Sequence, residues 1–393
     1  MQQLYSPRAQ FIIYIDMPRS LSSSSRTRRS PLPSLLLFSL FVAAKNASGE
    51  DDAGRRNLVV LVHGMGDTCC NPHSLGAIER AILEREGRNN NNNNTSKVIS
   101  IKFGRNGMSD FISGFIGNAY ALVEDFGCKQ LRRAKEEEEG EKIDGETIVL
   151  GFSQGGVFAR AMVETCEDEV NKLITFGSPH SGAWKFPGCD KMESALSRKW
   201  CEYSRKAASK AAYSKTLKSK SVQASYFRDV SDEERFKEYG RSGSLLSVIN
   251  GEGDASSTKQ SKRRREKMCN LDTFAMFSFE KDEVVVPRDS AVFSDAPSIP
   301  FEYTEEKASE LLNVRETKFY KNEEDGLCLR ELDGKKRMKI DVVPNANHMQ
   351  FSLEWFTEHV IEKYLIATPE EKEEEKVTHH TEDDSFVLLK AAR

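Results

Sequence analysis

One serine in this chain has the local sequence of an activated nucleophile. Ser153 lies in the run Gly-Phe-Ser-Gln-Gly at residues 151–155, after the apolar stretch 147–150 and before segment 157–163, whose apolar residues recur at helical spacing. A sharp strand-to-helix turn requires the two glycines, because side chains there would collide with the neighbouring strand or helix. Such a turn holds the serine hydroxyl exposed at the end of the strand, where it can attack a carbonyl group.

A nucleophilic serine needs a general base, and His348 has the most suitable surroundings. It closes a turn-rich loop, 344–348, between the β-like stretch 338–343 and the helix-like stretch 352–365. Three later histidines fall within that helix or in an acidic tail, where solvated surface positions are expected: His359, His379 and His380. His348 is therefore the predicted base.

The base in turn needs an acid to orient it, placed between serine and histidine in the chain. The stretch 273–279 is typical of a strand, and Asp282 falls in the turn just past it, ahead of residues 284–287. Asp282 is the predicted acid. Asp289, seven residues further on, is the alternative.

Hydrogen-bond donors for a developing oxyanion are expected after the serine and after an early strand. Residues 58–62 form a continuous apolar run that suits a buried parallel strand, and the run ends in His-Gly-Met-Gly-Asp at 63–67. We assign the donors to the backbone amides of Met65 and Gln154. His63 is expected to brace this loop by hydrogen bonding.

The elements that must position these residues follow one another as alternating strands and helices. A strand-like segment at 97–103 and an amphipathic stretch at 110–134 fill the interval between the first strand and the serine strand. This order predicts an α/β fold, an α/β-hydrolase with a mostly parallel central sheet flanked by helices. The chain is long enough for one such domain with insertions.

Several motifs resemble the lysosomal palmitoyl-protein thioesterases of type 1. The first is the loop His-Gly-Met-Gly-Asp-Thr-Cys-Cys-Asn-Pro at 63–72, followed by Ser-Leu-Gly-Ala-Ile at 74–78. Further matching segments occur in the same order over roughly residues 57–366: 151–156, 212–215, 222–224, 347–350 and 354–356. Because several independent motifs agree, coincidence is a poor explanation.

The resemblance implies removal of long-chain fatty acyl groups from cysteine thioesters of lipid-modified proteins. It implies Ser153, Asp282 and His348 as a catalytic triad and Met65 and Gln154 as oxyanion donors, the same five residues as above. A lumenal lipase or carboxylic esterase acting on oxygen esters is the alternative function, because the turn at 177–182, Gly-Ser-Pro-His-Ser-Gly, resembles that of lipases. His180 in this turn is expected to be structural.

The resemblance also places a helical insert before the acid, at about 183–268, over an apolar groove for the acyl chain. Either the groove or ordinary core accounts for the apolar residues of this insert: Trp184, Phe186, Trp200, Tyr213, Leu217, Tyr226, Phe227, Leu245, Leu246 and Ile249. Residues 251–267 are predicted to be a disordered loop, and the basic run 262–265 within it to be solvated, with contact to anionic membranes or proteolytic cleavage as alternatives.

Eight cysteines in the chain point to disulfide bonds, because the chain also begins like a secreted protein. The resemblance implies the pairs Cys69–Cys70, Cys128–Cys166 and Cys189–Cys201. Cys269 and Cys328 either pair with each other or stay free. No cysteine or histidine cluster has metal-ligand spacing, so neither a metal nor another cofactor is expected.

The N-terminus has the pattern of a signal peptide at residues 1–44: basic residues, a short apolar core and small residues at the cleavage position. Met17 is an alternative start. No other segment is apolar and long enough to span a membrane. Residues 45–56 are a predicted linker and residues 367–393 a disordered acidic tail. Glycosylation sequons begin at Asn46, Asn93 and Asn94.

The net charge of the chain without its predicted signal peptide limits which partners and which compartment are expected. Residues 1–44 carry five arginines and one aspartate, which leaves 52 basic and 60 acidic residues and a formal charge of −8. This balance argues against nucleic-acid binding. We expect S-palmitoylated proteins or peptides and fatty acyl thioesters as partners, a monomer, and a lysosomal or vacuolar location, with secretion as the alternative.

Overall fold

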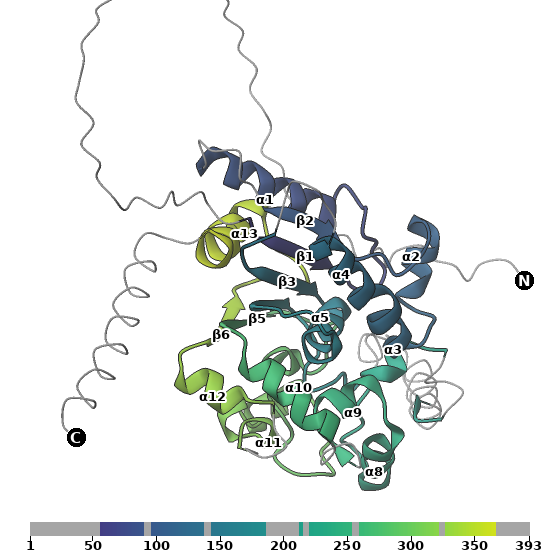
Figure 1. Ribbon diagram of the computed structural model, residues 1–393. Helices are drawn as coiled ribbons and strands as arrows, with labels where there is room; N and C mark the ends of the chain where they lie inside the picture. Colours follow the sequence, from purple (N-terminus) through teal and green to yellow (C-terminus); the bar gives the residue numbers. More distant parts are fainter. Residues whose placement is uncertain are drawn as a thin grey trace, which may run out of the picture.

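Six parallel strands form the centre of the molecule (Figure 1). The computed structural model describes residues 56–89, 96–136, 143–185, 212–214, 220–253, 259–321 and 327–366. The strands lie in the order β2-β1-β3-β4-β5-β6, and each neighbouring pair is parallel. Their bounds are β1 Leu58–Val62, β2 Lys97–Ser100, β3 Thr147–Phe152, β4 Lys172–Phe176, β5 Thr273–Phe279 and β6 Met338–Val343. All their carboxyl ends therefore meet at one edge of the sheet.

Helices cover both faces of this sheet. On one face lie α1 (Leu75–Asn89) and α13 (Leu353–Phe356), and the latter continues as the π-helix η7 (Thr357–Leu365) (Figure 1). The other face carries α4 (Lys129–Glu136), α5 (Gln154–Thr165) and α10 (Lys259–Cys269). The remaining helices are α2 (Gly107–Ser113), α3 (Ala119–Ala121), η1 (Leu122–Cys128), η2 (Gln223–Ser225), α8 (Glu233–Ser242), α9 (Leu245–Ile249), η4 (Arg288–Val292), η5 (Glu305–Glu310), η6 (Val314–Glu316), α11 (Lys318–Lys321) and α12 (Leu329–Gly334).

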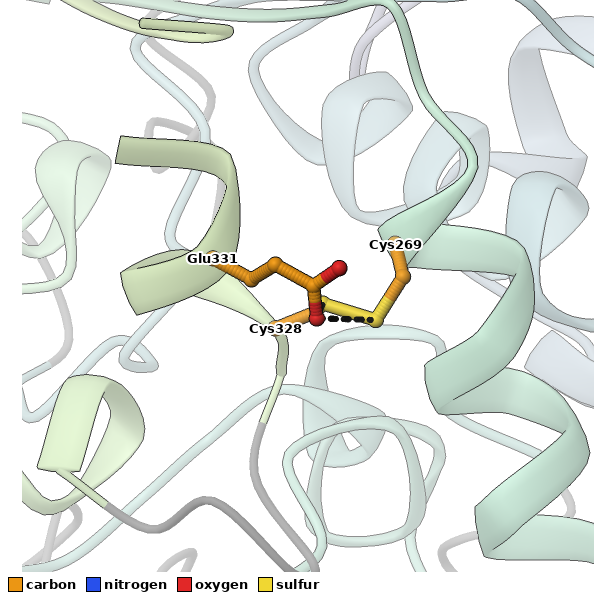
Figure 2. Close-up of side chains that lie close together, drawn as sticks. All are labelled: Cys269, Cys328 and Glu331. Carbon is orange, nitrogen blue, oxygen red and sulfur yellow. Dashed lines mark hydrogen bonds between the residues drawn. A yellow bond between two sulfur atoms is a disulfide. The ribbon is translucent and has the colours of Figure 1, made fainter. Parts of the chain in front are cut away.

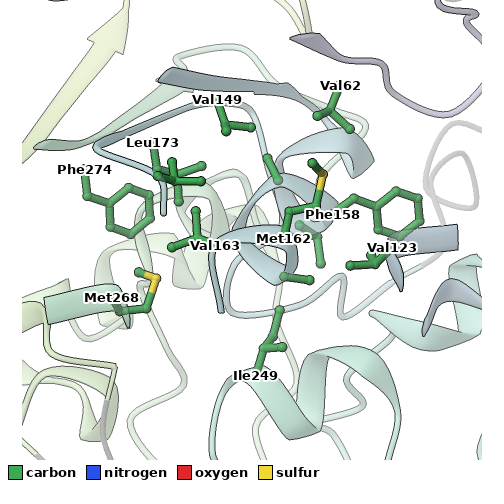
Figure 3. Close-up of a cluster of buried hydrophobic side chains, with 14 of the residues drawn as sticks. Val62, Val123, Val149, Phe158, Met162, Val163, Leu173, Ile249, Met268 and Phe274 are labelled. Atoms are coloured by element: carbon green, nitrogen blue, oxygen red, sulfur yellow. The ribbon is translucent and has the colours of Figure 1, made fainter. Parts of the chain in front are cut away.

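Two apolar cores follow from this layering. Successive side chains of a strand point to opposite faces of the sheet, so in β1 the residues Leu58, Val60 and Val62 enter one core while Val59 and Leu61 enter the other. All five are fully buried, which explains why β1 is apolar throughout and does not alternate. Figure 3 shows the larger core, packed between the sheet and helices α5, α9 and α10.

The insert between β4 and β5 is helical, and it corrects one prediction. Residues 259–267, expected to belong to a disordered loop, form most of α10, which packs against α5. The helix is held by its buried Met268, by an ion pair between Arg264 and Glu164 (3.9 Å), and by a disulfide from Cys269 to Cys328 (Figure 2). Residues 254–258 lie outside the described part of the chain.

Disulfide bonds join three pairs of described cysteines: Cys69–Cys70, Cys128–Cys166 and Cys269–Cys328. Several predictions lie outside the described residues: the signal peptide, the acidic tail, the sequons and the pair Cys189–Cys201. Among the helices that the structure describes, none combines the length and the apolar composition needed to cross a bilayer.

Candidate active site

Ser153 occupies the turn between β3 and α5 with a strained backbone. Its φ of 54° and ψ of −126° lie in a region that non-glycine residues rarely adopt. The flanking glycines make the turn possible: a Cβ on Gly151 would collide with the backbone of Gly156, and one on Gly155 would collide with the carbonyl oxygens of Val62 and His63. The serine amide donates to the carbonyl of Phe176 (2.7 Å), which ties the turn to β4.

Ser153, His348 and Asp282 form one chain of hydrogen bonds. His348 Nε2 lies 2.8 Å from Ser153 Oγ, and its Nδ1 lies 2.6 Å from Asp282 Oδ2. Because a carboxylate only accepts, Nδ1 carries the proton and Nε2 is free to accept one from the serine. His348 comes from the loop after β6, so three strands of the sheet, β3, β5 and β6, each supply one member at their carboxyl ends.

The acid is fixed independently of the histidine. Asp282 Oδ1 accepts from the amides of Val284 (2.8 Å) and Val285 (3.0 Å), and its side chain is only 1% exposed. Asp289, the alternative acid, instead lies 3.9 Å from Arg288 on η4, with a side chain that is 39% exposed. The structure therefore brings Asp282, and not Asp289, to the histidine.

The amides of Met65 and Gln154 adjoin the serine from two sides. Gln154 begins α5, so its amide has no acceptor within the helix. Met65 follows Gly64, on which a Cβ would lie 3.0 Å from that of Ser153, so the loop at 63–67 passes close to Ser153. Neither amide donates to another described residue.

Asp110 of α2 braces the Met65 loop from beneath. Its carboxylate accepts from the amides of Cys69 (2.8 Å) and Phe103 (2.6 Å), and it lies 3.2 Å from Nε2 of the buried His63. Burial of His63 disfavours its charged form, but the hydrogen bond and charge of Asp110 outweigh burial and raise the pKa of His63. His63 thus holds the loop and makes no contact with the serine–histidine pair in the described structure.

A mostly apolar cavity opens beside Ser153. It is lined by Met65, Ser153, Gln154, Pro179, Ala183, Lys185, Gln223, Tyr226, Phe227, Val284 and Val285. Tyr226 and Phe227 come from the insert, whereas Leu245, Leu246 and Ile249 of the same insert lie in the core under the sheet. Val284 and Val285, next to the acid, complete the wall. The cavity therefore offers a mostly apolar surface next to the serine hydroxyl.

Two side chains at the cavity contact the predicted oxyanion donors, Met65 and Gln154, and these contacts were not predicted. Tyr226 donates its hydroxyl hydrogen to Gln154 Oε1 (3.0 Å), and Gln223 Nε2 donates to the carbonyl of Gly114 (2.9 Å) while contacting Met65 Sδ (3.0 Å). The motif Val-Gln-Ala at 222–224 matches the family resemblance, but the sequence predicts no contact for Gln223. Its role depends on contacts across more than a hundred residues, which spacing in the sequence does not reveal.

A buried ionic network anchors the insert over the site. The guanidinium of Arg228 pairs with Asp295 (2.7 Å) and with Glu252 (3.1 Å), and Glu252 also accepts from Tyr239 (2.8 Å) and Lys318 (2.6 Å). Burial opposes the charged form of Glu252, but Arg228 and Lys318 outweigh it and lower its pKa to about 2. The insert is thereby joined to segments after β5.

His180 is structural, as its surroundings show. It is fully buried, stacks on Phe293 at 4.9 Å between ring centroids and contacts Thr175 Oγ1 through Nε2 (2.9 Å). Burial, with a smaller effect of the charge of Arg160, lowers its pKa well below the ordinary value.

Within the described residues, one cluster has ligands of metal-binding type. It consists of Cys269, Cys328 and Glu331, but both sulfurs are joined in a disulfide and only the carboxylate of Glu331 lies beside them (Figure 2). Thiolates are the form of cysteine that binds metals, so this cluster offers no metal site while the disulfide is intact.

A parallel sheet with a serine at the β3–α5 turn, an acid after β5 and a histidine after β6 defines an α/β-hydrolase. The family model for palmitoyl protein thioesterases matches residues 58–348, and the chain belongs to that family. The expected fold class is confirmed.

Named relatives agree with this family. Palmitoyl-protein thioesterase 1 of Caenorhabditis elegans is 28% identical over 311 residues, which cover 78% of this chain and 91% of the relative. A palmitoyl-protein thioesterase–dolichyl pyrophosphate phosphatase fusion of Schizosaccharomyces pombe is 27% identical over 82% of this chain and 46% of its own length. The lysosomal thioesterase PPT2 homolog of Drosophila melanogaster is 26% identical over 51% of this chain and 62% of its own length.

Solved structures are similar only distantly. A carboxylesterase of the thaumarchaeon Nitrososphaera gargenis is 13% identical, with a TM-score of 0.31 over 84% of this chain and 91% of the other. Est1E of Butyrivibrio proteoclasticus is 12% identical, with a TM-score of 0.38 over 80% of this chain and 90% of its own. Neither similarity bears on the reaction.

Proposed function

We propose that this hydrolase cleaves long-chain fatty acyl thioesters, in particular palmitoyl groups on cysteines of S-acylated proteins or peptides. The observation that carries the proposal is the hydrogen-bonded chain from Asp282 through His348 to Ser153, which ends at the wall of an apolar cavity. Membership of the palmitoyl protein thioesterase family supports the same substrate class.

Acylation would begin when His348 Nε2 takes the proton of Ser153 Oγ, which attacks the thioester carbonyl. The tetrahedral oxyanion would be held by the amides of Met65 and Gln154, both of which are turned toward no other described acceptor. Asp282 would keep the histidine in the required tautomer and stabilise its charged form. The tetrahedral intermediate then collapses, the C–S bond breaks, His348 gives its proton to the departing sulfur, and the acyl group stays on the serine.

Deacylation would use the same residues with water as the nucleophile. His348 takes a proton from water, the hydroxide attacks the acyl-serine carbonyl, and the proton returns to Ser153 Oγ as the fatty acid departs. The strained backbone of Ser153 keeps its hydroxyl in place through both steps.

The acyl chain would lie in the cavity formed by Tyr226, Phe227, Val284 and Val285. Each methylene that leaves water contributes about 0.8 kcal/mol, so a long chain binds far more strongly than a short one. This term gives selectivity for long chains without a specific polar contact.

We further propose that the protein acts in a lumenal compartment, a lysosome or vacuole. Three disulfides among the described residues support an oxidising environment, and one relative is named a lysosomal thioesterase. The signal-peptide pattern of residues 1–44 is consistent with this route.

The test compares hydrolysis of a palmitoyl thioester and of the matching oxygen ester by the secreted, oxidised protein, with Ser153→Ala as the blank. A strong preference for the thioester that disappears in Ser153→Ala is expected. Equal or greater activity on the oxygen ester would instead identify a lipase or carboxylic esterase. Activity that persists in Ser153→Ala would contradict the assigned nucleophile.

A further inference from the structure

Helix α2 and the turn after it expose a group of large apolar side chains. Met108 is 70% exposed, Ile116 62%, Ile112 44% and Phe111 40%. Seven large apolar side chains are exposed in the described residues, and these four lie within nine residues of one another. We call them the α2 patch. Scattered exposed apolar residues need no explanation, but a contiguous group marks an interaction surface.

The orientation of α2 is the reverse of that expected for a surface helix. Its buried residue is the carboxylate Asp110, while its apolar residues face outward. Polar contacts hold this orientation: Asn106 and Ser109 cap each other, and Ser113 Oγ donates to the carbonyl of Phe103 (3.0 Å). The fold thus fixes the apolar face toward the outside, and Figure 1 shows α2 at the edge of the molecule.

The α2 patch borders the proposed active site. Gly114, at the end of α2, packs against the loop at 63–67: a Cβ on it would lie 3.4 Å from the amide nitrogen of Gly66 and 3.5 Å from Met65 Cα. The carbonyl of Gly114 also accepts from Gln223, which lines the cavity beside Ser153. An acyl chain held by a membrane at the patch would therefore be next to the cavity wall that Met65 and Gln223 form.

The charged residues around the α2 patch indicate what kind of surface it binds. Residues 101–118 carry two basic side chains, Lys102 and Arg105, both exposed, and one acid, Asp110, which is buried against His63. The amide of Gly117 donates to the carbonyl of Lys220 (3.2 Å), so a third exposed basic residue lies at the same turn. The chain as a whole has a net charge of −4, so this positive rim is a local departure that suits anionic headgroups.

We propose that the α2 patch docks onto an anionic lipid bilayer, with its apolar side chains in the acyl region and the basic rim at the headgroups. The inference rests on the proposed function only for the benefit of docking, since lipid-modified substrates lie at membranes. The test of docking measures binding to vesicles and does not depend on that function. Binding strength at such surfaces scales with buried apolar area plus attraction to anionic lipids. Docking would bring that cavity wall close to the membrane surface.

The experiment measures co-sedimentation with vesicles, using the full secreted chain with Ser153→Ala so that no turnover is involved. The vesicles contain phosphatidylcholine alone or phosphatidylcholine mixed with phosphatidylserine. We expect binding to the mixed vesicles that weakens with added salt. Met108→Gln combined with Ile112→Gln and Ile116→Gln should weaken binding at least about tenfold, because binding scales with apolar area.

A matched control removes exposed apolar side chains elsewhere. Leu83→Gln with Val342→Gln, 36% and 50% exposed, should bind like the parent. Arg105→Gln, which leaves the apolar side chains intact, should weaken binding to the mixed vesicles only and so tests the surface even if the triple variant misfolds. No binding by the parent, or equal binding by the parent, the triple variant and Arg105→Gln, would overturn the inference. Patch-dependent binding by a protein without thioesterase activity would leave the inference standing and refute the proposed function.

Discussion

Replacing Asp282 by Asn tests the proposed mechanism, because it changes only one carboxylate oxygen into an NH₂ group. The carboxylate satisfies two kinds of donor at once: the amides of Val284 and Val285 at Oδ1, and His348 Nδ1 at Oδ2. Asparagine has one oxygen and one NH₂ group, so it can accept on one side only. If its oxygen stays on the two backbone amides, its NH₂ faces Nδ1, and the histidine proton must move to Nε2. The nitrogen that faces Ser153 then no longer accepts a proton.

The size of the expected loss in kcat follows from the burial of Asp282 and from the loss of His348 as a base. The Asp282 side chain is 1% exposed, so water has no room to restore the tautomer. The same replacement in serine proteases of the trypsin type lowers kcat about 10⁴-fold. At about 1.36 kcal/mol per tenfold, this corresponds to about 5.4 kcal/mol of lost transition-state stabilisation. We expect a loss of this order with the fold intact.

The assay compares kcat for a palmitoyl thioester in Asp282→Asn and in Asp289→Asn. The latter changes a 39% exposed carboxylate that lies 3.9 Å from Arg288, so its effect should stay below about threefold. Thermal midpoints equal to that of the parent protein would show that both variants fold. A larger loss in Asp289→Asn than in Asp282→Asn would refute the assigned acid.

Three further predictions concern stability. Gly155→Ala should lower the free energy of unfolding in urea by about 1–3 kcal/mol, because the new Cβ collides with carbonyl oxygens. Gly87→Ala is the control: its new Cβ in α1 has no neighbour within 4 Å, so it should be neutral or stabilising. Equal effects of the two substitutions would contradict the tight turn. Arg228→Ala leaves the buried Asp295 without its cation and Glu252 with Lys318 as its remaining cation, and it should cost about 3–5 kcal/mol in the same assay. Arg132→Ala, in an exposed pair, should cost far less, and a small loss for Arg228→Ala would argue against the network. The pKa of His63, the partner of Asp110, is raised, so the stability that its charged form contributes is complete below about pH 6.5 and is lost as pH rises. The pKa of Asp110 is lowered, so the stability that its carboxylate contributes is present above about pH 4. Asp110→Asn should therefore lower the thermal midpoint more at pH 5 than at pH 8, and a pH-independent loss would contradict the pairing.

Local sequence was sufficient for residues that occupy strand ends. Ser153, Asp282 and His348 each follow an apolar stretch long enough to be recognised as a strand, and parallel strands bring their carboxyl ends to one edge. The fold class followed from the alternation of these stretches with helices. The sequence favours Asp282 as the acid and keeps Asp289 as an alternative, because the conformation of the turn decides which carboxylate reaches the histidine.

Features held by distant contacts were not predicted. The run at 259–267 is strongly basic, a pattern typical of solvated loops, yet it forms a helix that packs against α5 and whose last residue, Cys269, is bonded to Cys328, 59 residues away. The network of Arg228 joins Glu252 and Asp295, which lie 24 and 67 residues from it. Similarly, the outward-facing apolar side of α2 results from the burial of Asp110 against His63, 47 residues earlier.

The most direct measurement of the central claim is mass spectrometry of the enzyme quenched during turnover of a palmitoyl thioester. The mechanism predicts one palmitoyl group on the peptide that contains Ser153, formed at the rate of thiol release and removed as free fatty acid appears. In Ser153→Ala the adduct and the turnover should both vanish. Turnover without an acyl-enzyme, or an adduct on another residue that is kinetically competent, would contradict the account.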